Sequence, residues 1–156
     1  MAEYRFLTAW LIDGHPIDVW NAIYEVESWP EWWHGVERVE RLAPGDENGV
    51  GQAFRNRWRS VLPYTVEFDV TIRRADPPSL IELDADGVLA GEGRWRMFHA
   101  GAVAITYEWH VRTTRAWMNA LAPVAGPVFK WNHNAIMRRG GDGLARRVGG
   151  ALFAAS

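Results

Sequence analysis

The chain has 156 residues, 48% of them apolar and 23% charged, and a formal net charge of −2. This length and composition fit one folded globular domain, residues 1–156, and exclude a disordered chain. A protein that neutralises many phosphates carries a basic excess, so nucleic acid is not an expected partner. The chain has no cysteine, which excludes disulfides and thiolate metal sites and agrees with a cytoplasmic location. No apolar run approaches the roughly 20 residues of a membrane helix, so integral membrane association is not expected.

The first part of the chain predicts a strand followed by two short helices. The strand is Tyr4–Ile12, and His15-Pro16 opens the first helix because Pro suits the first helical turn. The second short helix is Trp29–Trp33, closed by Gly35. Strand-like segments then follow at short spacing, namely Val36–Leu42, Gly51–Ser60, Tyr64–Ala75, Leu80–Ala85, Glu92–His99 and Val103–Thr113.

After Arg115 the period of the apolar pattern changes from that of a strand to that of a helix. Apolar residues step by three and four, which predicts a long terminal helix. Pro123 and Pro127 should kink it near its start, and Gly140-Gly141 should weaken its tail. Consecutive strands with short loops form an antiparallel sheet, whose only large partner is this helix, so the fold class is α+β. The side chains expected to face the sheet are Trp117, Leu121, Val128, Trp131 and Ala135, and those expected to face away are Lys130, Asn134 and Arg138.

Alternation of apolar and polar residues distinguishes the two faces of the sheet. In Tyr64–Arg73 one parity is apolar and the other polar, as in a strand with one buried and one wet face. Arg55, Arg57 and Arg59 are interpreted as an outer face that pairs with acidic residues, and the alternative is a cavity wall for an acidic ligand. Several polar residues share the inner face, which predicts either satisfied core groups or a cavity with a few polar points. These residues are Asn56, Ser60, Tyr107, His99 and Asn132.

Local motifs for catalysis or metal binding are absent from the sequence. The histidines, at positions 15, 34, 99, 110 and 133, have no metal-ligand spacing within one element, so neither a metal nor a cofactor is predicted. No HExxH, P-loop or GxSxG motif occurs. Glu82 and Asp84 share one face of a strand and are interpreted as the outer face of an edge strand.

The chain resembles the START-like, polyketide cyclase/dehydrase superfamily (SRPBCC) in the segments HPIDVWNAIYEVESWPEWW, GVGQAFRNRW, PYTVEFDVTIRRADPPSLIEL, GEGRW and ITYEWHV, followed by the long terminal helix. The resemblance covers nearly the whole chain. It implies a helix-grip fold: a curved antiparallel sheet of about six to seven strands wrapped around a long C-terminal helix, two short helices after strand 1, and a cavity in between. Members bind lipids, sterols, hormones or polyketides, and some cyclise and dehydrate aromatic polyketides. In the catalytic members, pocket hydroxyls and an inward Arg polarise ketone oxygens, and Ser60 could serve in this way here.

The sequence therefore predicts a domain that binds a small hydrophobic or aromatic molecule in an internal cavity between the sheet and the C-terminal helix. The short helix Trp29–Trp33 is expected to form the rim of this cavity. Its walls should come from inner-face side chains that do not meet the helix, and from the helix itself. The predicted ligand-binding residues are Asn56, Trp58, Ser60, Phe68, Trp95, Met97, Tyr107, Trp109, Trp117, Leu121 and Asn132.

Two alternative functions belong to other classes. The first is an enzyme, a polyketide cyclase/aromatase or dehydratase, in which a pocket side chain acts as acid or base. The second is a Trp-rich partner-docking domain, which exposed Trp29, Trp32 and Trp33 would favour. The catalytic candidates for the enzyme are Ser60, Tyr107, His99 and His34.

Overall fold

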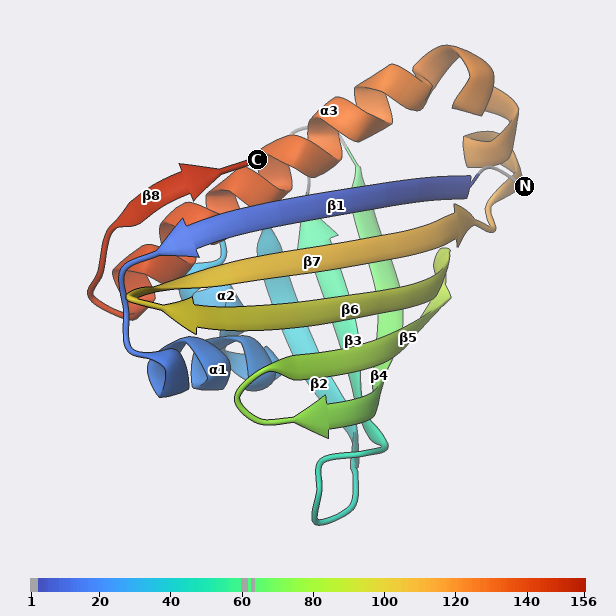
Figure 1. Cartoon of the computed structure of the whole chain (residues 1–156). Helices are drawn as coiled ribbons and strands as arrows, with labels where there is room; N and C mark the ends of the chain where they lie inside the picture. Colours follow the sequence, from blue (N-terminus) through green and yellow to red (C-terminus); the bar gives the residue numbers. More distant parts are fainter. Residues whose placement is uncertain (1–2, 60–61, 63) are drawn as a thin grey trace.

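The computed structural model describes residues 3–59, 62 and 64–156. These residues form one antiparallel sheet of eight strands in the order β2-β3-β4-β5-β6-β7-β1-β8, and the long helix α3 lies along the sheet (Figure 1). The predicted α+β helix-grip architecture is confirmed. The strands are β1 (Glu3–Ile12), β2 (Val36–Pro44), β3 (Gln52–Arg59), β4 (Thr65–Asp76), β5 (Leu80–Gly87), β6 (Leu89–Ala100), β7 (Ala102–Thr113) and β8 (Leu152–Ala155). The helices are α1 (Pro16–Tyr24), the 3-10 turn η1 (Val26–Ser28), α2 (Trp29–Trp32) and α3 (Ala116–Arg147).

The described sheet contains one strand more than the six to seven expected, and the additional strand is β8. It pairs antiparallel with β1, placing Ala155 opposite Trp10. Gly149 adopts a φ of 73°, a left-handed conformation that suits glycine, where the chain leaves α3 and turns back toward β1. Because β8 is short and mostly exposed, its sequence has no alternation of buried and exposed residues that would reveal a strand.

The arginines of β3 lie on the outer face of the sheet, as the preferred interpretation predicted. Arg55 donates from Nε to Asp69 Oδ1 (2.9 Å) and from a terminal nitrogen to Asp69 Oδ2 (3.2 Å). Arg57 Nε lies 3.1 Å from one carboxylate oxygen of Glu37, and the other oxygen of Glu37 lies 3.6 Å from a terminal nitrogen of Arg59. These pairs are solvent-exposed, so each contributes at most about 1 kcal/mol. The alternative of a cavity for an acidic ligand lined by these arginines is wrong.

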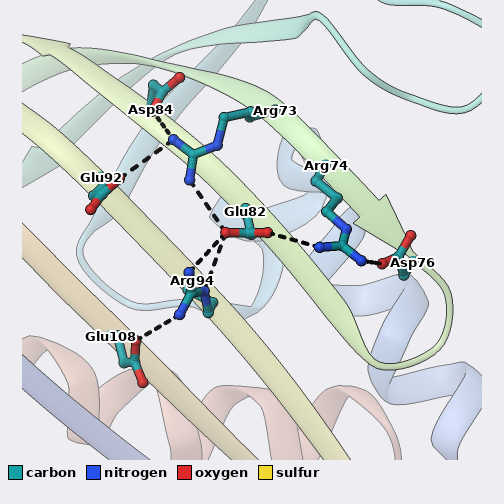
Figure 2. A network of polar contacts seen from close by, with 8 residues as sticks. All are labelled: Arg73, Arg74, Asp76, Glu82, Asp84, Glu92, Arg94 and Glu108. Atoms are coloured by element: carbon teal, nitrogen blue, oxygen red, sulfur yellow. Dashed lines mark hydrogen bonds and ion pairs between the residues drawn. The ribbon is translucent and has the colours of Figure 1, made fainter.

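A larger ion-pair network covers the outer face of β4, β5, β6 and β7 (Figure 2). At its centre the Glu82 carboxylate accepts from Arg94 (3.0 Å) and Arg73 (3.3 Å), and Arg94 extends the network to Glu108 (3.5 Å). The hydrogen bond from Arg94 lowers the pKa of Glu82 below its ordinary value. Glu82 and Asp84 are on the outer face as expected, but β5 lies between β4 and β6, so the assignment to an edge strand is wrong.

The face of α3 that was predicted to pack on the sheet is wrong. The residues that point inward lie one position further along the chain than the predicted ones. Trp131, for example, is 58% exposed, whereas its neighbour Asn132 is buried. One residue corresponds to a rotation of about 100° around the helix axis. The first half of α3 is apolar on two adjacent faces, so the three-and-four spacing alone does not show which face is buried. The expected inward residues that are exposed are Trp117, Leu121, Val128 and Trp131, whereas Lys130, Asn134 and Arg138 are exposed as predicted.

Glycines near the end of α3 bring the helix against the tryptophans. A Cβ atom at Gly140 would lie 2.5 Å from a ring carbon of Trp33, and one at Gly143 would lie 1.8 Å from the carbonyl oxygen of Trp32. Trp33 Nε1 also donates to the carbonyl oxygen of Ile136 (3.0 Å). α3 continues through Gly140-Gly141 to Arg147, so these glycines do not end the helix, and whether they weaken its tail stays a prediction.

The start of α3 shows the effect expected of its prolines. Pro123 and Pro127 both lie within the helix. Figure 1 shows the first turns of α3 set at an angle to the rest of the helix. Each proline removes a backbone donor and crowds the preceding turn, which accounts for the bend. No described helix has both the length and the hydropathy needed to cross a membrane.

Candidate functional site: a cavity beneath α3

A cavity of about 140 Å³ lies between the inner face of the sheet and the middle of α3. Inner-face side chains of β1, β3, β4, β6 and β7 form its walls, together with α2 and one face of α3. The lining residues are Tyr4, Phe6, Trp29, Trp33, Trp58, Tyr64, Val66, Phe68, Leu89, Trp95, Tyr107, Trp109, Val111, Thr113, Met118, Phe129, Asn132, His133, Ile136 and Met137.

Tryptophan rings from separate elements build the deep wall of the cavity. Trp33 and Trp58 meet edge to face with ring centroids 4.9 Å apart. Trp95 stacks on Tyr107 at 4.0 Å, and Tyr107 in turn stacks on Trp109 at 5.7 Å. Aromatic contacts of this kind hold large rings in fixed orientations. The deep wall is therefore a rigid aromatic surface.

The opposite wall is formed by β1 and α3. Phe6 stacks on the imidazole of His133, with centroids 3.8 Å apart. Phe129 meets Tyr4 edge to face at 6.1 Å. Phe6 and Tyr4 are two residues apart in β1, so both side chains point to the inner face. Aromatic rings therefore lie on both sides of the cavity.

The ionisable groups that line the cavity are uncharged at neutral pH. Burial lowers the pKa of His133 to about 4, so its imidazole is neutral at pH 7. Burial raises the pKa of Tyr107 well above its ordinary value, so its phenol keeps its proton. Burial also raises the pKa of both Tyr4 and Tyr64. None of the described lining residues is an Asp, Glu, Lys or Arg.

Four lining residues carry a buried polar atom without a hydrogen-bond partner among the described residues. These atoms are the hydroxyl oxygen of Tyr4, Nε1 of Trp58, Nε1 of Trp95 and Nδ1 of His133. Each of these atoms is shielded by its neighbours, so none of them is presented to the cavity as a free donor or acceptor.

Six of the eleven predicted ligand-binding residues line the cavity, and four lie elsewhere. Asn56 is buried, but its Nδ2 donates to the carbonyl oxygen of Phe54 (3.2 Å), and Met97 belongs to the packed core. Trp117 and Leu121 point outward because the helix is rotated relative to the prediction. Ser60 lies outside the described residues. The predicted residues that line the cavity are Trp58, Phe68, Trp95, Tyr107, Trp109 and Asn132.

Of the catalytic candidates, too, only some line the cavity. Tyr107 lines the cavity, whereas His34 and His99 are exposed and are not among its lining residues. His99 lies near the end of β6, so its expected inner-face parity does not place it in the cavity, and His34 lies between α2 and β2, outside any strand. The histidine that does line the cavity is His133, which the sequence analysis treated only as one of five scattered histidines.

The tryptophans of the short segment Trp29–Trp33 are buried, whereas Pro30 and Glu31 of α2 are exposed. Trp29, Trp32 and Trp33 are all at most 6% exposed. Exposure of these three tryptophans would have favoured the partner-docking function, and it is not observed. Among the described residues, no group of three His, Cys, Asp or Glu side chains could hold a metal ion.

The curved sheet, the helix across it and the cavity between them define a START-like helix-grip protein. A family model described as polyketide cyclase / dehydrase and lipid transport matches residues 8–149. The chain belongs to this family. No curated protein sequence matches the chain significantly.

Solved structures show the same fold at low sequence identity. The Zhui aromatase/cyclase from Streptomyces sp. R1128 matches with a TM-score of 0.78 and 14% identity, over 95% of this chain and 94% of that chain. A START superfamily protein from Mycobacterium smegmatis matches with a TM-score of 0.71 and 13% identity, over 94% and 97%. The di-domain ARO/CYC BexL from the BE-7585A biosynthetic pathway matches with a TM-score of 0.75 and 16% identity, over 94% of this chain and 50% of that chain. This chain thus spans half the length of that di-domain protein.

Proposed function

We propose that this protein binds a small hydrophobic or aromatic molecule in the cavity between the sheet and α3. The observation that carries the proposal is a cavity with aromatic walls and no charged side chain among its described lining residues, which include the hydroxyl-bearing Tyr107 and the amide-bearing Asn132. Small-molecule sites have this composition: apolar walls provide affinity and a few polar groups orient the ligand. Membership of a family of cyclases, dehydrases and lipid-transport proteins supports a site in this position.

We further propose that residues 1–156 act as a single ligand-binding domain in the cytoplasm. Pairing of β1 with β8 places the first and last strands side by side in one sheet, which supports a single folding unit. The absence of cysteine agrees with a reducing compartment.

The test is a fluorescence titration with a panel of sterols, fatty acids, flavonoids, polyketide mimics and single-ring aromatics. Because Trp58 and Trp95 line the cavity, a bound molecule should quench their emission along a saturable 1:1 curve. Val66→Phe adds a ring on the cavity side of β4 and should abolish the quenching. Thr65→Phe places the same ring on the exposed side of the same strand and should leave quenching unchanged. Absence of saturable quenching across the whole panel would refute the proposal.

The second candidate function is a cyclase or dehydratase. The observation that favours it is the Tyr107 hydroxyl in the cavity wall, since a phenol that keeps its proton can donate to a ketone oxygen as negative charge develops. Turnover of a poly-β-ketone mimic should then occur and should fall at least about 100-fold in Tyr107→Phe. If neither protein forms product while ligands still quench fluorescence, binding alone is the function.

A further inference from the structure

A stripe of exposed apolar side chains runs along the N-terminal half of α3. Its members recur at steps of four and three residues, so in a regular helix they fall within an arc of about 80°. Figure 1 shows this half of α3 at the periphery of the molecule. The most exposed members are Val124, at 84%, and Trp131, at 58%. The α3 stripe, as we call this set, consists of Trp117, Leu121, Val124, Val128 and Trp131.

The α3 stripe differs from the ordinary scatter of exposed apolar residues. Single apolar side chains are common on protein surfaces, whereas a contiguous group marks an interaction surface. Of the twelve large apolar side chains exposed among the described residues, five belong to the stripe. The other side of the same helical turns already has its role, because Met118, Phe129 and Asn132 line the cavity. The stripe therefore faces a partner outside the domain.

The charges around the α3 stripe indicate the chemistry of that partner. All 19 Asp and Glu residues of the chain lie outside residues 109–141. Within this segment, Arg115, Lys130 and Arg138 have exposed side chains. Cations beside apolar side chains complement a surface that is itself apolar and anionic. The five cations of the segment are Arg112, Arg115, Lys130, Arg138 and Arg139.

A protein partner fits the α3 stripe less well than a lipid surface does. In a two-fold contact between copies of this chain, one stripe would face the other. Lys130 and Arg138 would then approach their counterparts, and the segment has no acidic residue to pair with them. The stripe also has an indole at each end, in Trp117 and Trp131. Tryptophan is enriched where the apolar part of a bilayer meets water.

We propose that the α3 stripe docks on the surface of an anionic lipid bilayer. The apolar side chains enter the headgroup region, and Lys130 and Arg138 lie near the anionic headgroups. The helix lies on the bilayer and does not cross it. Docking needs no molecule in the cavity, so the proposal goes beyond the proposed function and does not depend on it. It would hold the cavity about one helix diameter, roughly 10–12 Å, from the lipid.

Co-sedimentation of the full chain with sucrose-loaded vesicles tests the proposal. One set of vesicles contains phosphatidylcholine alone, and the other contains about 30% phosphatidylserine in addition. The partition coefficient onto the anionic vesicles should be at least about tenfold higher, because each cation near the surface contributes a factor of about five. Raising the NaCl concentration from about 0.1 M to about 0.5 M should remove most of this preference, since salt screens the charges.

Variants at exposed positions separate the apolar contribution from the charge. Trp131→Ala should lower the partition coefficient onto anionic vesicles at least about fivefold. Phe98→Ala is its matched control, because Phe98 is 53% exposed but lies on β6, and it should change nothing. Lys130→Gln should cost about fivefold on anionic vesicles and nothing on neutral ones. Arg38→Gln, on β2, removes an equally exposed cation outside the segment and should have no effect.

Each contrary outcome has a defined meaning. Absence of partition onto anionic vesicles, or equal partition onto both vesicle types, would overturn the proposal. Equal losses from Trp131→Ala and Phe98→Ala would overturn it too. A dimer in analytical ultracentrifugation that Trp131→Ala dissociates would assign the stripe to a second copy instead. None of these results affects the ligand-binding proposal, which the fluorescence panel tests separately, and failure of that panel would leave membrane docking standing.

Discussion

The two ends of helix α3 contact the molecule in different ways. Near the C-terminal end, Gly140 and Gly143 face Trp33 and the backbone of Trp32, and no side chain separates the helix from them. In the N-terminal half, Trp117 and Trp131 are large apolar residues, yet they are 47% and 58% exposed. The closest approach of this helix to the tryptophans is thus at its glycines, whereas two of its largest side chains point to solvent.

The cavity lies between these two regions. Where the inward face of α3 carries glycines, the helix backbone rests on indole rings and leaves no space. Farther toward the N-terminus the inward face carries Phe129, Asn132 and His133, and these side chains line the cavity. Because the helix packs closely through its glycines at one end and carries inward side chains in the middle, the cavity lies under the middle of the helix.

The largest effect should come from adding one methyl group at the anchored end. Gly143→Ala would place Cβ 1.8 Å from the Trp32 carbonyl oxygen, so the backbone must shift, and the free energy of unfolding should fall by about 3 kcal/mol. Asp142→Ala changes the exposed neighbouring residue of the same helix and should change the free energy of unfolding by less than about 1 kcal/mol. Urea unfolding measures both. Equal effects of the two substitutions would refute the comparison.

The middle of the helix should show a pH-dependent stability. The pKa of His133 is about 4 in the folded protein and about 6.5 when unfolded, so between these values the unfolded chain binds the additional proton. The stability that depends on neutral His133 is complete above about pH 6.5 and should fall by up to about 3 kcal/mol as the pH approaches 4. His133→Phe keeps a ring against Phe6 and should remove this part of the pH dependence. Identical pH profiles of the two proteins in chemical unfolding would contradict the prediction.

A smaller loss should follow from Trp33→Phe, which tests the anchor from the side of the tryptophan. The substitution removes the hydrogen bond from Nε1 to the Ile136 carbonyl oxygen and part of a ring that is 1% exposed. The expected loss is about 2 kcal/mol in the free energy of unfolding. A loss below about 0.5 kcal/mol would show that the anchor does not depend on this indole.

The smallest effect is expected in the exposed N-terminal half. Trp131→Ala removes a large side chain that is 58% exposed, so the free energy of unfolding should change by less than about 1 kcal/mol. The thermal midpoint of the variant, compared with that of Trp33→Phe, measures the contrast. A greater loss from Trp131→Ala would reverse the assignment of the two regions.

The sequence predicted the sheet better than it predicted the helix. Alternation along β3, β4 and β7 placed Trp58, Phe68, Tyr107 and Trp109 correctly because a strand has only two faces. Helix α3 offers several faces, and its apolar residues occupy two of them, so Trp117 and Leu121 were assigned inward wrongly. Glycines contribute nothing to a hydrophobic pattern, which is why the pattern did not reveal the close packing at this end of the helix.

The remaining differences have physical causes as well. His133 was not distinguished from the other histidines, because its role depends on a stacking contact with Phe6 from the opposite end of the sequence. Asn56 has the expected parity and is buried, but it bonds to its own strand instead of facing the cavity. Parity predicts which face a side chain occupies, and it does not predict where along that face a cavity opens.

The central claim is that the ligand enters the cavity beneath α3 and not the exposed apolar half of the helix. The chain has ten tryptophans, and each gives one indole N–H signal in a two-dimensional ¹H–¹⁵N NMR spectrum. Titration with a molecule of the fluorescence panel that quenches emission should shift the assigned indole signals of Trp58 and Trp95, and should leave that of the exposed Trp131 in place. A shift of the Trp131 signal without shifts of the Trp58 and Trp95 signals would place the molecule on the surface of the helix and contradict the account.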